Sequence, residues 1–161
     1  MVILRRLLLL AALAFWQGGF TFYATVVVPM GEEVLGSSID QGFVTQRVAN
    51  YLNLAGAVAL PLLFWDVAAV KKKSRLRAAS WLVMAVSLGL LAGMHAYLDQ
   101  FLDAESKSVM DHSRFYFAHE VYLTVCAVQW ASGLVFLFTT LRVWRAEDQR
   151  MAAAKLVEGQ A

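Results

Sequence analysis

The sequence predicts an all-α integral membrane protein, a four-helix bundle whose helices run antiparallel in up-down-up-down order. Of its 161 residues, 60% are hydrophobic and only 16% are charged, and the apolar residues gather in long runs. An ordinary soluble domain is about 45–50% apolar and about 25% charged, and a soluble fold of this size could not cover so much apolar surface. The single cysteine excludes an intrachain disulfide scaffold.

Four segments are long and apolar enough to cross a bilayer, which takes about 20 mostly apolar residues. These spans are expected at about residues 7–30, 48–70, 78–98 and 115–141. Short connections make neighbouring helices run in opposite directions. The chain therefore divides into a four-span transmembrane domain, residues 1–144, and a polar tail, residues 145–161, which we expect to prolong the fourth helix.

Prolines and glycines add detail to the helices. Pro29 lies at the end of the first span and is expected to end it, whereas Pro61 lies inside the second span and should bend it. In the third span, Gly89 and Gly93 form a small-x-x-x-small pattern. We expect this face to pack closely within the bundle, the alternative being contact with a second copy of the chain.

Basic residues determine the expected orientation, because they are enriched in cytoplasmic segments of membrane proteins. Eleven of the 14 basic residues fall at the N-terminus, between spans two and three, or in the tail. Both termini are therefore expected in the cytoplasm, with the chain in a cell membrane, the inner membrane if the source is bacterial. The basic linker sets topology and meets anionic lipid; we expect no binding of nucleic acid.

Polar residues inside the spans gather towards the outer half of the bundle, where they are costly unless they form a site or pack together. His95 and His119 lie at similar depth on neighbouring helices, so they are the candidate ligands for a cofactor. The side chains expected to converge around this histidine pair and support it are Asn50, Asn53, Asp99, Glu120 and Tyr122.

Two interpretations of the histidine pair remain open. In one, the histidines hold haem b or a transition metal, because histidine is the commonest metal ligand and a carboxylate often fixes its tautomer. In the other, they form hydrogen bonds between helices. Cys126 is expected to be a small core residue. Asp66, near the inner end of the second span, is expected to reach the interface or to pair with a basic residue.

Three segments carry a resemblance to a known family. They are Gly19-Phe20-Thr21-Phe22-Tyr23, Leu52-Asn53-Leu54-Ala55-Gly56 and Phe115-Tyr116-Phe117-Ala118-His119-Glu120. Through these segments the chain resembles the transmembrane protein 205-like family of small bacterial four-span proteins. The resemblance covers most of residues 15–140. This resemblance implies distant similarity to copper-resistance membrane domains and to a haem-containing protoporphyrinogen oxidase family. The chain departs from the oxidase pattern, because its first two spans contain no histidine.

The sequence contains no glycine-rich phosphate loop, nucleophile elbow or paired zinc ligands, which disfavours an enzyme. We therefore expect a multi-pass accessory or structural membrane protein. The alternative is a haem- or metal-binding protein that uses the histidine pair near the outer face. A transporter or channel is the weakest hypothesis, because no inverted repeat is visible. The expected partners are the lipid bilayer and either a second copy or another protein of a membrane complex.

Overall fold

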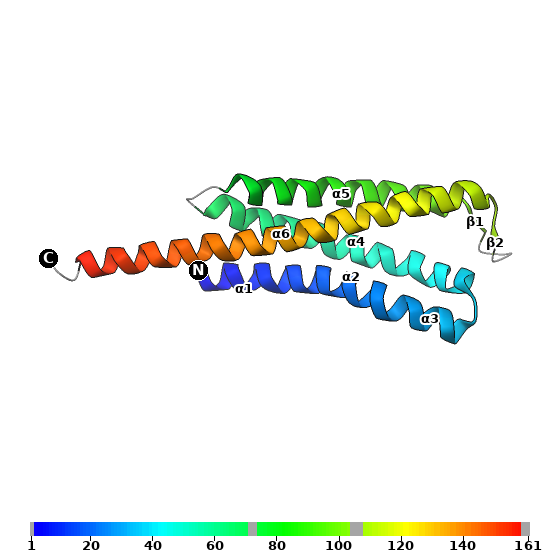
Figure 1. Ribbon diagram of the computed structural model, residues 1–161, viewed down its shortest axis with the longest axis horizontal. Coiled ribbons are helices and arrows are strands. Elements are labelled where there is room, and N and C mark those ends of the chain that lie inside the picture. Colours follow the sequence, from blue (N-terminus) through cyan, green and yellow to red (C-terminus); the bar gives the residue numbers. More distant parts are fainter. Residues whose placement is uncertain (1, 71–73, 104–107, 159–161) are drawn as a thin grey trace.

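The protein folds into a bundle of four long helices that lie side by side, as seen in a computed structural model that describes residues 2–70, 74–103 and 108–158 (Figure 1). The start of the first helix, the end of the second and the start of the third lie at one end, here called the terminal end. The end of the first helix, the start of the second, the end of the third and the start of the fourth lie at the opposite end, the hairpin end. All four helices are long and apolar enough to cross a membrane by length and composition. The all-helical bundle expected from the sequence is thus confirmed.

The first helix, Val2–Leu35, contains two turns of π-helix. The second π-turn ends at Val27, and Pro29 is the second residue of the α-helical segment that follows. A proline at the start of a new α-helical segment costs little, because its missing N–H would have few partners there. The prediction that Pro29 ends this helix is therefore wrong, and the helix ends at Gly36, whose φ of 63° glycine adopts readily. The segments are α1 (Val2–Leu13), η1 (Ala14–Gly18), α2 (Gly19–Phe22), η2 (Tyr23–Val27) and α3 (Val28–Leu35).

The second helix, α4, runs from Ser38 to Ala69 and continues through Pro61. Its first turn is capped by Ser37, whose hydroxyl accepts a hydrogen bond from a backbone N–H at 3.1 Å. The third helix, α5 (Arg75–Asp99), begins at a similar serine cap. Serine caps therefore set where both of these helices begin.

The fourth helix, α6, is a single rod from His112 to Glu158. Its 47 residues correspond to about 70 Å, and its last part projects beyond the terminal end of the bundle (Figure 1). The polar tail does prolong the fourth helix. Two short strands, β1 (Leu102–Asp103) and β2 (Ser108–Val109), pair antiparallel before α6, with Leu102 opposite Val109.

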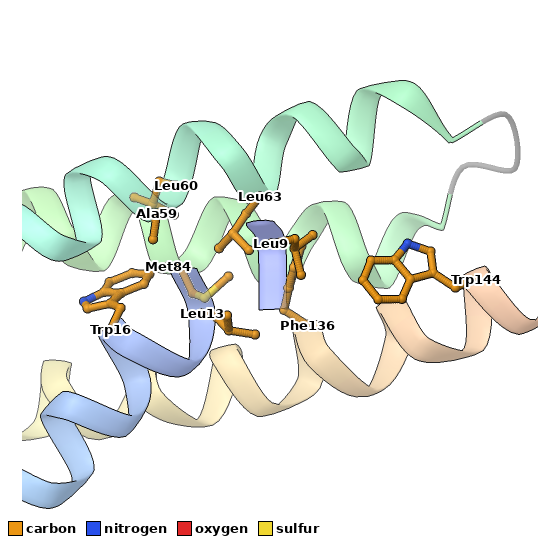
Figure 2. Close-up of a cluster of buried hydrophobic side chains, with 9 residues drawn as sticks. All are labelled: Leu9, Leu13, Trp16, Ala59, Leu60, Leu63, Met84, Phe136 and Trp144. Carbon is orange, nitrogen blue, oxygen red and sulfur yellow. The ribbon is translucent and has the colours of Figure 1, made fainter. Parts of the chain in front are cut away.

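The buried apolar core occupies the half of the bundle nearer the terminal end (Figure 2). Each helix packs mainly on the next in the chain, and the contact between α5 and α6 is the most extensive. The core is built from side chains of all four helices, with Met84 and Phe136 fully buried. Its members are Leu9, Leu13, Trp16, Ala59, Leu60, Leu63, Met84, Phe136 and Trp144.

Close approach of helices occurs at glycines other than those expected. A Cβ atom at Gly56 would lie 2.6–2.9 Å from the ring of Trp16, so only glycine lets η1 and α4 meet there. Gly89 and Gly93 are exposed, and a Cβ atom at either would meet nothing within 4 Å. The expected packing of that glycine face within the bundle is therefore wrong, because α5 turns its serine-containing face inward instead.

Candidate functional site

Buried polar side chains gather at both ends of the bundle. The terminal node is centred on Asp66 and consists of Arg5, Asp66, Arg77, Thr140 and Trp144. The hairpin cluster is centred on His95 and consists of Gln46, His95 and Asp99.

The terminal node connects all four helices through one carboxylate. Asp66 of α4 is completely buried, and its Oδ1 lies 2.6 Å from Nε of Arg5 in α1. Its Oδ2 accepts a hydrogen bond from Nη2 of Arg77 in α5 and another from the indole of Trp144 in α6 at 3.0 Å. Arg77 also donates through Nε to Thr140 at 2.9 Å. The prediction that Asp66 pairs with a basic residue is confirmed, with two partners rather than one.

A second, more exposed layer of charges closes the terminal end. Arg6 donates to both carboxylate oxygens of Asp148, each at 2.9 Å, and to Glu147 at 3.2 Å. The guanidinium also lies over the ring of Trp144, 5.1 Å from its centroid. These hydrogen bonds from Arg6 hold the pKa of Asp148 below its usual value. The start of α1 is thereby attached to the extension of α6.

The sequence alone did not indicate how the node is assembled. Trp144 lies at a depth typical of an interfacial aromatic belt, yet its side chain is buried and donates to Asp66. Arg5 looked like a topology signal, yet it is an ion-pair partner. With both oxygens of Asp66 engaged by cations and an indole, this carboxylate is suited to holding helices together rather than to relaying protons.

The hairpin cluster lacks the close ion pairs of the terminal node, in which Oδ1 of Asp66 and Nε of Arg5 are likewise without a hydrogen bond. His95 of α5 is 8% exposed, and its Nε2 is buried without a hydrogen-bond partner. The nearest carboxylate oxygen, Oδ2 of Asp99 one turn along, is 3.7 Å away, beyond hydrogen-bond distance. Asp99 in turn accepts a hydrogen bond from Gln46 of α4 at 2.9 Å. The structure therefore brings His95 and Asp99 together, and adds Gln46, which was not among the expected site residues.

Tyr122 and Cys126 lie one turn apart on α6. Tyr122 is half-buried. Cys126 is buried, as expected for a core residue. The supporting role of Tyr122 stays a prediction.

Other expected members lie outside this arrangement. Asn50 and Glu120 are exposed, so their expected convergence on a shared pocket is wrong. The reason is helical geometry, since the buried face of α4 passes through Ala49 and Gly56, and Asn50 is turned away from that face by about 100°. Asn53 is half-buried and has no hydrogen-bond partner in the described residues.

His119 is half-buried and stacks on Phe115, with ring centroids 5.9 Å apart and an interplanar angle of 9°. Its ring makes no hydrogen bond or ion pair with any residue in the described ranges. The pairing of His119 with His95 thus stays a prediction.

The cluster offers a cofactor one buried imidazole nitrogen with a carboxylate nearby. Within residues 2–70, 74–103 and 108–158, no group of three or more histidine, cysteine or acidic side chains is arranged to hold a metal ion. An axial imidazole ligand to a larger group, such as haem, needs only the single nitrogen that His95 presents. Comparison of the chain with family models, with curated proteins and with solved structures finds no match.

Proposed function

We propose that the chain is a multi-pass membrane protein whose four helices cross the bilayer antiparallel, in up-down-up-down order. The observation that carries this proposal is the reversed distribution of polarity. Large apolar side chains such as Phe15, Tyr51 and Phe138 are exposed on the outside, whereas Asp66 and Arg77 are buried inside. Water would disfavour such a surface, and a bilayer would favour it.

The proposed orientation places both termini in the cytoplasm of the cell, most simply at a bacterial inner membrane. It is supported by the basic residues that gather at the terminal end and by the projecting polar part of α6. A reporter fused after Ala161 should behave as cytoplasmic, and one inserted near Ser106 as external. The reverse pattern would overturn the orientation.

The role we propose is structural or accessory, in contact with lipid and with a second copy or another membrane protein. The terminal node supports this role, because one buried carboxylate holds four helices in a fixed arrangement. Membership of the transmembrane protein 205-like family, suggested by the sequence motifs, fits the same proposal.

A second candidate function is binding of haem or a transition metal at the hairpin cluster. The specific observation in its favour is the buried Nε2 of His95, which has no partner within hydrogen-bond distance. A buried polar atom in this state is costly unless something absent from the chain itself binds it. His95 and His119 would hold the group, and Asp99 would orient His95.

An absorption spectrum and metal analysis of protein purified in detergent test this second candidate. A Soret band or bound metal that is lost in His95→Ala and reduced in His119→Ala would support it. His112→Ala is the matched control, since His112 is exposed at the start of α6 and should leave the spectrum unchanged. A colourless and metal-free protein would eliminate this candidate while leaving the membrane proposal intact.

A further inference from the structure

The middle of the bundle contains a glutamine whose side-chain amide oxygen and nitrogen both lack a hydrogen-bond partner. Gln17 lies in the π-helical turn η1, and its amide oxygen and nitrogen are both buried without a hydrogen-bond partner. The amide packs directly on Gly133 of α6, where a Cβ atom would lie 2.9–3.2 Å from its atoms. The glycine therefore makes the room in which this amide sits.

Two further buried polar side chains lie about one helical turn nearer the hairpin end. Gln129 is one turn from Gly133 towards the hairpin end, and it is only 3% exposed. Ser87 of α5 is 5% exposed. Arg77 bonds Thr140 across the α5–α6 interface, and these helices run in opposite directions. Ser87 follows Arg77 by ten residues on α5, and Gln129 precedes Thr140 by eleven residues on α6. Ser87 and Gln129 therefore lie at the same depth in the bundle.

These three side chains, here called the middle layer, do not satisfy one another. Neither Ser87 nor Gln129 has a hydrogen bond through its side chain to any residue that the structure describes. By contrast, the neighbouring Thr21 accepts a hydrogen bond from Trp130 at 2.9 Å. Polar groups at the centre of an apolar bundle need partners, because neither lipid nor core side chains supply any.

The chemistry of the middle layer defines what it would bind. Two amides and a hydroxyl carry no charge, so they offer no counter-charge to a metal ion or a phosphate. Each of the three both donates and accepts hydrogen bonds. The ligand that matches this lining is small, neutral, and both donor and acceptor. Water fits it, and buried water typically makes about three hydrogen bonds.

We propose that the middle layer of Gln17, Ser87 and Gln129 is a binding site for ordered water at the centre of the bundle. The π-turn η1 and Gly133 are the features of the fold that create this site. It lies between the two end clusters and does not depend on a cofactor at His95.

Water-edited solid-state NMR of the full-length protein in lipid bilayers tests this proposal. Glutamine side chains labelled with ¹⁵N receive magnetisation only from water protons close to them. The signals of Gln17 and Gln129 are assigned by their loss in Gln17→Met and Gln129→Met. We expect both to receive magnetisation from water as exposed Gln149 does, whereas the backbone amides of fully buried Leu63 and Phe136 do not.

A shared water also predicts coupling between the two glutamines. Gln17→Met should reduce water transfer to Gln129, and the reverse substitution should reduce transfer to Gln17. Gln149→Met is the matched control and should remove only its own signal. Transfer to Gln17 and Gln129 as slow as to the buried backbone amides would overturn the proposal. Transfer from lipid acyl chains to exposed Leu54 and Phe138 reports membrane insertion separately, so the two proposals fail independently.

Discussion

At the terminal end of the bundle, Asp66 has both carboxylate oxygens in contact with donors from three other helices. At the hairpin end, His95 is almost as deeply buried, yet its Nε2 has no hydrogen-bond partner. In the first arrangement the buried carboxylate forms close ion pairs, although Oδ1 of Asp66 and Nε of Arg5 make no hydrogen bond. The second is more open, because the carboxylate nearest to His95 is 3.7 Å away. Paired buried charges stabilise one arrangement of helices, whereas an open polar cluster leaves bonding capacity for a ligand.

The apolar core strengthens this contrast. It lies in the half of the bundle next to the terminal node, with Leu9, Leu63 and Phe136 fully covered (Figure 2). Packing and charge pairing therefore reinforce each other at one end. The opposite end carries the cluster with the unpaired histidine, which is why we place the candidate ligand site there and the structural role at the terminal end.

The largest expected effect is that of Asp66→Asn, which leaves buried Arg77 without its counter-charge and Arg5 with only Glu147, 3.9 Å away. Breaking a buried ion pair by removing one partner typically costs about 3–5 kcal/mol. Unfolding in detergent, followed by heat and by denaturant, measures the loss. Asp99→Asn is the matched control at the hairpin end, where the carboxylate is half-exposed. Equal losses in the two variants would remove the distinction between the ends.

Arg77→Lys should have the next largest effect, because lysine cannot reach Asp66 and Thr140 together as the guanidinium fork does. A hydrogen bond to a charged group contributes about 1.5–3 kcal/mol, so the free energy of unfolding should fall by that order. Arg142→Lys serves as the control, since Arg142 is exposed and lies over exposed Phe138. A tolerated Arg77→Lys would mean that charge alone holds the node.

His95→Leu should change stability little, by about 1 kcal/mol or less in either direction, because removing an unpaired polar atom loses no hydrogen bond. Thermal unfolding of the purified protein measures this, with His112→Leu as the exposed control. A loss comparable to that of Asp66→Asn would contradict the open character of the hairpin cluster. It would indicate that a bound group already satisfies His95.

The smallest effect is expected for Asp148→Asn, because the Arg6–Asp148 pair is exposed and screened by salt. The pKa of Asp148 is lowered by its hydrogen bonds from Arg6, so the contribution of this pair is present at neutral pH. It is lost as the pH falls through the lowered pKa and Asp148 becomes protonated. A melting temperature that differs between wild type and variant at acid pH but not at neutral pH would contradict this assignment.

The sequence by itself determined the helical class, the four apolar helices and the continuation of the last helix into the tail, because run length and composition are local properties. It also indicated that His95 and Asp99 lie next to each other, since residues four apart are neighbours on a helix. Helix ends were predicted less well. The first helix continues through Pro29 because the proline stands at the start of a new α-helical segment after a π-turn. Composition does not mark such a turn.

Which face of each helix turns inward was decided only by the tertiary structure. Asn50 and Glu120 lie outside, and Gly89 and Gly93 look outward, although each was expected at an interface. A rotation of about 100° per residue separates inside from outside, and apolar residues on every face of a membrane helix leave no periodic signal to choose between them. The assembly of Arg5, Asp66, Arg77 and Trp144 depends on these rotations in all four helices together, so only the folded bundle could specify it.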